Sequence, residues 1–346
     1  MRAFESIQFT SLQPGPRLIV TGAVHGNETC GTVAVRRVLD DIEQGRLNLV
    51  AGTVTFVPVS NPLAYAKRQR EGDRNLNRKL APTAEPHEFE DHVANWLCPL
   101  LAQHDALLDL HAFRTPGEAF AMIGPENNTN TLEPFTHAAR EQALVARLGV
   151  HRIVDGWLST YAAGVEQRRK RLAIERPQAD DLRRPPPEGG KETWGGPAFP
   201  CAGQPALEMH ADYGVGTTEF MRRSGGWAIT LECGQLDDPH APQLAYQAIR
   251  NTLAHLGLSD EPDPPPANPI EGLRLFQVVD KQHELDRFTR AWASFDAVQA
   301  GELIALRHDG TPLHAPSGGR VVFPNPAAEP GKEWYYLARP QGRFGA

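Results

Sequence analysis

Two residues that often bind metal ions lie three positions apart near the start of the chain. His25 and Glu28 follow the apolar run 18–20, and a glycine between them lets the backbone turn. A short β-prone run that ends in a glycine-flanked turn predicts a buried strand, and the pattern after Glu28 predicts a helix. We therefore expect His25 at the end of the strand and Glu28 in the first helical turn, where open α/β sheets place their sites. Such a pair suits Zn²⁺ if a third protein ligand joins it.

This spacing alone is weak evidence for a metal site. The chain has 13 histidines, and the same His-x-x-Glu spacing recurs at His87 and Glu90. We interpret that second pair, which lies in a charged segment, as part of a solvated helix. The case for a metal ion therefore depends on residues elsewhere in the chain.

Two later predicted strands also carry ionisable residues near their carboxyl ends. The apolar run 106–111 ends in His111, and the run 227–234 contains Glu232. Asp109 shares a strand face with His111, so it could accept a hydrogen bond from a metal-binding histidine, although a salt-bridged carboxylate is the alternative. A glutamate in a buried strand needs a partner such as a metal-bound water, an arginine or a helix terminus.

Arginine and asparagine side chains are concentrated in the segment 67–78. Guanidinium and amide groups pair with carboxylates in directional arrangements, so this segment could form a wall that binds a carboxylate. A solvent-exposed loop is the alternative interpretation. The basic cluster 168–171 is followed by acidic residues, and we interpret it as a solvated loop or helix face.

Composition limits the classes of function. A chain of 346 residues with 40% hydrophobic residues predicts one large domain and a smaller one, and a net charge of −7 gives no reason to expect nucleic acid as a partner. No apolar run approaches the about 18 residues of a membrane span, and the start shows no signal-peptide pattern. We expect a cytoplasmic protein without a membrane partner, whose four scattered cysteines are free thiols. The oligomeric state stays open, a homo-oligomer included.

The patterns predict two domains. Residues 1–258 are predicted to form an α/β domain with a mixed, mostly parallel sheet flanked by helices. An insertion at about 168–200, rich in Arg, Asp, Pro and Gly, is typical of a functional lid or a disordered loop. The proline-rich residues 259–269 predict a stiff linker, and the short β-like runs of residues 270–346 predict a small all-β domain.

Several motifs together resemble the succinylglutamate desuccinylase/aspartoacylase family of the zinc carboxypeptidase-like superfamily. In order over roughly residues 15–235, they are Gly22–Glu28, Asn75–Arg78, Asp109–His111 and Leu231–Gly234. Members of this family use one zinc ion to hydrolyse an N-acyl amino acid to a carboxylic acid and a free amino acid. The resemblance implies a zinc carboxypeptidase-like fold, with a C-terminal β domain that partly covers the mouth of the active site.

The resemblance also implies which residues form the metal centre. His25, Glu28 and His111 would hold one Zn²⁺ per chain, and Glu232 would be the general base and proton shuttle. Asn75 stands where many relatives have an acidic residue. It can still accept a hydrogen bond from a zinc histidine, but without charge.

Three further residues receive roles toward the substrate from the same resemblance, and a fourth is our own candidate. Arg70 would stabilise the oxyanion together with the zinc, and Asn77 with Arg78 would bind a substrate carboxylate. Arg222, ten positions before Glu232, is a candidate for a second carboxylate contact.

The sequence leaves several alternatives open. A small-molecule N-acyl amino acid is the expected substrate, while a zinc carboxypeptidase acting on peptides and a catalytically idle binding protein are the alternatives. The acyl group and the amino acid are not specified. Tyr335 or Tyr336 would add a hydroxyl to the site or belong to the core of the last strand, and His104 or His210 would replace His111 if that residue is not the third ligand.

Overall fold

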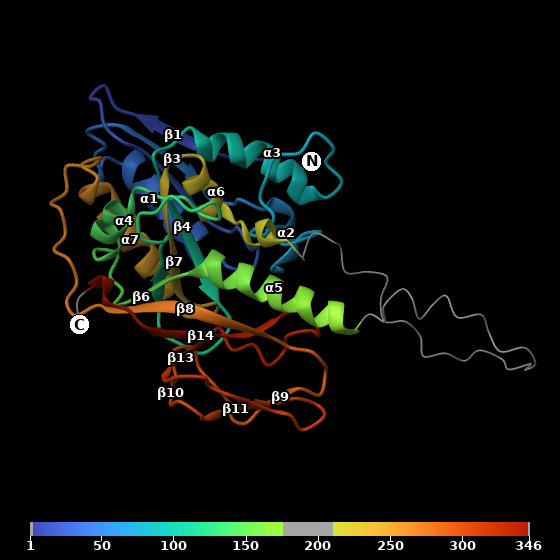
Figure 1. The fold of residues 1–346 in the computed structure, drawn as a ribbon. Coiled ribbons are helices and arrows are strands. Elements are labelled where there is room, and N and C mark those ends of the chain that lie inside the picture. Colours follow the sequence, from blue (N-terminus) through green and yellow to red (C-terminus); the bar gives the residue numbers. More distant parts are fainter. Residues whose placement is uncertain (1–2, 176–209, 345–346) are drawn as a thin grey trace, which may run out of the picture.

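The computed structural model describes residues 3–175 and 210–344, which form a large sheet with helices packed on both faces (Figure 1). The strand order is β1-β3-β2-β4-β7-β5-β6-β8-β14-β13-β10, and β12-β11-β9 form a second, small sheet. The strands are β1 (Ile7–Thr10), β2 (Arg17–Thr21), β3 (Thr53–Val57), β4 (Ala106–Phe113), β5 (Phe120–Met122), β6 (Arg152–Asp155), β7 (Trp227–Gln235), β8 (Glu271–Asp280), β9 (Arg287–Phe288), β10 (Ala297–Val298), β11 (Leu303–Leu306), β12 (Pro312–His314), β13 (Gly319–Val322) and β14 (Glu333–Pro340). The predicted mixed α/β fold is confirmed.

The central strands β3, β2, β4 and β7 run parallel to one another. Their residues are apolar on both faces, as expected for strands that are covered by helices on each side. Thr21 pairs with Asp109, and His111 pairs with Glu232 in the neighbouring strand. The turn after β2 and the ends of β4 and β7 therefore meet at the same edge of the sheet.

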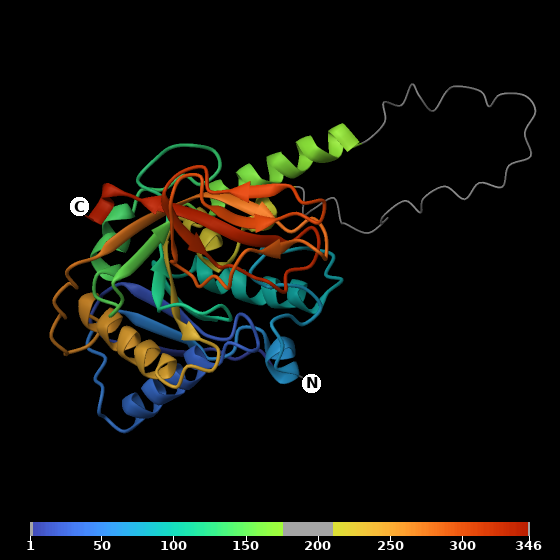
Figure 2. The same cartoon turned by 90° about the horizontal axis from the view of Figure 1, so that it is seen from below.

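Helices cover both faces of the central strands. The described helices are α1 (Cys30–Glu43), α2 (Pro62–Lys67), α3 (Phe89–Ala102), α4 (Ala138–Val145), α5 (Trp157–Glu175), α6 (Thr217–Arg223) and α7 (Ala241–His255), with short 3₁₀ turns η3 (Ala211–Gly214) and η4 (Gly342–Phe344). Helices α1 and α7 lie side by side on one face (Figure 2). The other face carries α3 and α6, whose apolar side chains pack on β2 and β4.

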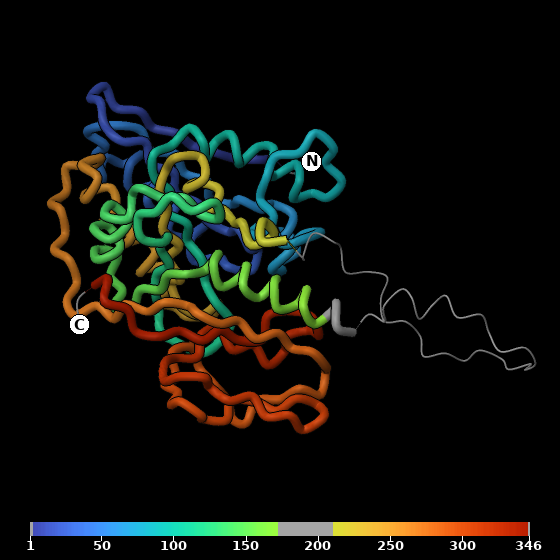
Figure 3. The backbone as a smooth tube through the Cα atoms, in the orientation of Figure 1, coloured from blue at the N-terminus to red at the C-terminus, as the bar shows by residue number. Residues whose placement is uncertain are grey.

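The C-terminal strands continue the main sheet. β8 pairs in parallel with β6, and β14, β13 and β10 follow by antiparallel pairing. In the tube drawing, the orange and red C-terminal segments lie directly alongside the α/β part (Figure 3). Residues 271–340 are rich in strands, as predicted, but only β9, β11 and β12 form a sheet of their own.

The short strand β6 ends at Asp155, and the long helix α5 follows it. Two local predictions were wrong. Arg168, interpreted as solvated, is buried and forms two hydrogen bonds with Asp280 of β8, at 2.7 and 3.1 Å. Glu90, which was also interpreted as solvated, is buried. Its carboxylate accepts hydrogen bonds from a neighbouring loop, and the sequence could not predict that this loop packs against it.

Other predictions fall partly outside the described residues. The proposed insertion at about 168–200 begins inside α5, and its part from position 176 onward is not described. Cys30, Cys98 and Cys233 are buried free thiols, while Cys201 lies outside the described residues. No helix among the described residues combines the length and apolar character needed to cross a membrane.

Candidate functional site

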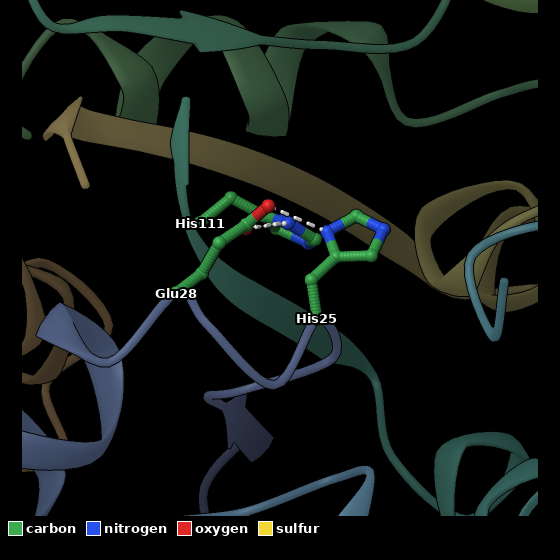
Figure 4. A group of neighbouring side chains, drawn as sticks. All are labelled: His25, Glu28 and His111. Atoms are coloured by element: carbon green, nitrogen blue, oxygen red, sulfur yellow. Dashed lines mark hydrogen bonds and ion pairs between the residues drawn. The ribbon is translucent and has the colours of Figure 1, made fainter. Parts of the chain in front are cut away.

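Three side chains from two segments converge at the carboxyl edge of the sheet. His25 and Glu28 lie on the turn between β2 and α1, and His111 lies near the end of β4 (Figure 4). Each residue is 2% exposed, and their candidate ligand atoms lie within 4.8 Å of one another. Glu28 precedes α1 by two positions instead of lying in its first turn. The structure thus brings together the three residues that the sequence predicted as metal ligands.

The carboxylate of Glu28 lies between the two imidazoles. Its Oε1 is 2.8 Å from Nδ1 of His25, and its Oε2 is 2.9 Å from Nδ1 of His111. The turn that carries it needs a glycine, because a Cβ on Gly26 would lie 1.9 Å from the carbonyl carbon of Ala64. The chain between the two ligands therefore packs directly against α2.

The outer nitrogen of each imidazole faces an acceptor. Nε2 of His25 is 3.1 Å from Oδ1 of Asn75, and Nε2 of His111 is 2.7 Å from Oδ2 of Asp109. In a neutral imidazole, an acceptor at Nε2 favours the tautomer with its hydrogen there, which leaves the Nδ1 lone pair directed at the cluster. Asp109 and Asn75 occupy the supporting positions that the sequence predicted for them.

These residues fit a divalent cation. Nδ1 of His25 lies close to Glu28 but is not aligned for a hydrogen bond, and it has no other partner among residues 3–175 and 210–344. Two imidazole nitrogens and one carboxylate form a ligand set of catalytic Zn²⁺ sites, in which a fourth position stays open. A cation among the three groups would satisfy this buried nitrogen.

The charges of the cluster agree with this assignment. Burial, together with the positive charge of Arg70, lowers the pKa of His25 to about 4, so this imidazole is neutral near pH 7. Burial opposes ionisation of Glu28, but the two histidines hold its pKa well below the usual value. Burial likewise lowers the pKa of His111, but Asp109 and Glu28 outweigh it and hold that pKa well above the usual value. Cation binding at His111 would therefore release a proton.

Glu232 places a second carboxyl group beside the cluster. It lies on β7 directly across from His111 and is 8% exposed. Burial raises the pKa of Glu232 to about 7, and the negative charge of Glu28 adds to this effect. Its Oε2 has no hydrogen-bond partner within the described part of the chain. A carboxyl group with these properties can accept and return a proton near neutral pH.

Arg70 reaches the cluster from the loop after α2. Its Nη1 donates a hydrogen bond to Oε1 of Glu28 at 2.9 Å, while 45% of its side chain is exposed to solvent. Arg70 therefore brings a positive charge to the solvent side of the three candidate ligands.

Asn77 and Arg78 lie further along the same loop, and both are half-buried. Arg78 donates to the backbone carbonyl of Asn77, and its guanidinium lies 4.8 Å from the ring centre of Trp157. The ring of Tyr336, from the last strand, is 5.5 Å from that of Trp157, and its hydroxyl is buried without a partner among the described residues. Tyr335 instead packs in the C-terminal core.

Glu90 shapes the loop that carries these residues. Its Oε1 accepts hydrogen bonds from the side chain of Asn61 and from the backbone of Gly72, and its Oε2 accepts from the backbone N–H groups of Asp73 and Arg74. Sequence analysis missed this role. The one signal in the sequence is the position of Glu90 among acidic residues at the start of a helix, where carboxylates are favourable.

Comparison with known families identifies the domain that holds this cluster. Residues 14–163 match the model of the succinylglutamate desuccinylase/aspartoacylase catalytic domain. The matched segment covers less than half of the chain. It contains all three candidate ligands as well as Arg70 and the loop after it, whereas Glu232 lies beyond the matched segment. The family consists of hydrolases. Comparison with curated proteins finds no match.

Several solved structures share the fold over nearly the whole chain. Succinylglutamate desuccinylase from Vibrio cholerae is 17% identical, with a TM-score of 0.67 over 97% of this chain and 85% of its own. A succinylglutamate desuccinylase/aspartoacylase from Rhodobacter sphaeroides is 16% identical, with a TM-score of 0.65 over 98% and 90%. The product-bound ectoine utilization protein from Ruegeria pomeroyi is 17% identical, with a TM-score of 0.64 over 96% and 88%.

Arg222 was also predicted as a substrate contact, and the structure does not support this prediction. Arg222 is buried, and its guanidinium is engaged by three glutamates and by the carbonyl of Ala228. The three glutamates are Glu141, Glu133 and Glu219. Ala228 precedes Glu232 by four residues on β7, which is about 13 Å along a strand. Arg222 thus stabilises the far end of β7.

Proposed function

We propose that this protein is a zinc-dependent amidohydrolase that cleaves an N-acyl amino acid into a carboxylate and a free amino acid. The observation that carries the proposal is the buried cluster of His25, Glu28 and His111, with both Nδ1 atoms directed inward. Glu232 lies beside it, and its Oε2 has no partner among the described residues. A bound Zn²⁺ would act there as a Lewis acid toward a water molecule and the amide carbonyl.

In this reaction Glu232 moves the proton. Its free carboxylate oxygen accepts a proton from the attacking water, and the resulting carboxylic acid then donates that proton to the leaving nitrogen. A pKa of about 7 suits both steps, because the group can be ionised before the attack and protonated after it.

The arginine-rich loop supplies the remaining roles. Arg70 brings fixed positive charge next to Glu28 and is partly exposed to solvent, which supports it as the stabiliser of an oxyanion formed at the cluster. Arg78 is half-buried and stacks on an aromatic ring, and it forms no ion pair with a described carboxylate within 4 Å. This arrangement, with Asn77 next to it, supports binding of the substrate carboxylate.

A zinc carboxypeptidase acting on peptides is the second candidate, because it would need the same metal ligands, base and arginine. We favour a small substrate, since Arg78 lies beside Trp157, which in turn lies beside Tyr336 of the C-terminal strand β14. These aromatic side chains would leave less room beside Arg78 for an extended peptide than for a small N-acyl amino acid.

The metal centre is tested by replacing His111 with alanine. We expect the purified His111→Ala protein to contain no stoichiometric zinc, while a His104→Ala control keeps it, because His104 hydrogen-bonds to Thr55 and Leu100 and does not join the cluster. Metal content is measured by atomic emission spectrometry after dialysis. Full zinc content in the His111→Ala protein would contradict the proposed ligand set.

A further inference from the structure

Thr217, the first residue of α6, contacts both halves of the candidate site. It is 1% exposed, and its hydroxyl donates a hydrogen bond to Oδ2 of Asp109. The same oxygen accepts the hydrogen bond from Nε2 of His111 at 2.7 Å, and Oδ1 accepts one from the hydroxyl of Thr21 at 2.6 Å. Side chains from three segments therefore hold a carboxylate that is completely buried.

The backbone of Thr217 contacts Asn77, one of the residues proposed to bind the substrate carboxylate. Its N–H donates to Oδ1 of Asn77 at 3.0 Å. The N–H of Asn77 in turn donates to Oδ1 of Asn75 at 2.9 Å, the oxygen that faces Nε2 of His25. The contacts form one continuous chain through His25, Asn75, Asn77, Thr217, Asp109 and His111.

The two contacts of Thr217 can be separated by mutation. Its hydroxyl has one hydrogen, and because this hydrogen is donated to Asp109, the 3.4 Å approach to Asn77 is not a second strong hydrogen bond. Replacing the hydroxyl by a methyl group would leave the backbone bond to Asn77 in place. It would remove only the contact with the carboxylate that orients His111.

We propose that Thr217 is a positioning residue for the metal centre, which acts through Asp109 to fix the orientation of His111. This inference rests on the proposed function, since it assigns a task in holding the same cation. Partners in this outer position orient the ligands of a metal ion, and their loss typically weakens metal binding by about 10–100-fold.

Zinc affinity of the full chain, measured by competition with a chromogenic chelator, tests the proposal. We expect Thr217→Val to weaken zinc binding about 10–100-fold and Thr217→Ser, which keeps the hydroxyl, to retain the wild-type affinity. Thr218→Val is the matched control, because within the described part of the chain the Thr218 hydroxyl donates its hydrogen bond to Glu219 and not to a residue of the cluster. If the valine variant does not fold, Thr217→Ala makes the same comparison.

A double substitution separates this role from a general effect on α6. Because Thr217 acts through Asp109, adding Thr217→Val to Asp109→Asn should weaken zinc binding little beyond the loss caused by Asp109→Asn alone. Unchanged zinc affinity in folded Thr217→Val, or full additivity in the double variant, would overturn the inference. Wild-type protein that binds no zinc would instead overturn the proposed function, and this inference with it.

Discussion

Glu232 is the residue on which the proposed chemistry depends most directly. We predict that Glu232→Gln retains zinc but loses activity by about 10²–10⁴-fold, because the amide keeps the size of the side chain and cannot accept the proton. Steady-state rates together with metal analysis check this prediction. Glu219→Gln is a useful comparison, since Glu219 lies in the buried cluster around Arg222. Near-normal turnover of Glu232→Gln would remove Glu232 from its role.

Single residues could be predicted from the sequence where a short spacing fixes direction. Asp109 and His111 lie two positions apart on a strand, so the sequence was sufficient to place them on one face, and their hydrogen bond confirms this. Arg222 could not be judged in the same way. Its glutamate partners lie on other segments of the chain, and nothing in its own neighbourhood indicates that they surround it.

The start of helix α3 holds the loop 70–78 in place through hydrogen bonds to Glu90. Glu90 lies in the first turn of α3 and holds three backbone N–H groups of this loop, at 3.0 to 3.1 Å. We predict that Glu90→Gln raises the KM of the deacylation reaction more than it lowers kcat, because the loop carries Asn77 and Arg78. We also expect a loss of about 1–3 kcal/mol in stability, since buried donors lose their acceptors.

Urea unfolding and steady-state kinetics measure these two effects. Glu85 is exposed and lies just before α3, so Glu85→Gln is the control. It should match the wild-type protein in stability and in KM. A Glu90→Gln protein with unchanged KM would show that the loop does not depend on this carboxylate.

The turn after β8 gives a prediction for the pH dependence of stability. Asp286 is buried. Burial opposes its ionisation, but hydrogen bonds from the backbone of Gln282, His283 and His308 and from Arg307 lower its pKa to about 2. A depressed pKa contributes stability above the unfolded pKa of about 4, and this contribution is lost as the pH falls toward 2.

We therefore expect Asp286→Asn to be destabilised at pH 7, by about 2 kcal/mol, and to approach the wild-type stability near pH 2.5. Urea unfolding at the two pH values measures this difference. Glu284→Gln is the control, because Glu284 lies in the same turn and is exposed. A stability difference that is equal at both pH values would contradict the proposed linkage.

The large sheet explains why local sequence patterns could bring the candidate ligands to one edge but could not predict the pairing of distant segments. Apolar runs that end in His25, His111 and Glu232 are local signals, and parallel strands bring their carboxyl ends to one edge. The pairing of β6 with β8, and the bond from Arg168 to Asp280, join segments more than 100 positions apart. No periodicity within either segment indicates such partners.

The proposal as a whole is tested most directly by the release of free amine from a panel of N-acetyl and N-succinyl amino acids, with dipeptides alongside. The full-length protein is assayed as purified, after removal of metal with a chelator, and after zinc is restored. We expect release from at least one N-acyl amino acid that disappears with the metal and returns with zinc, while the dipeptides stay intact. Cleavage of dipeptides alone would contradict the proposal in favour of a carboxypeptidase, and zinc-bound protein without activity on any substrate would contradict both.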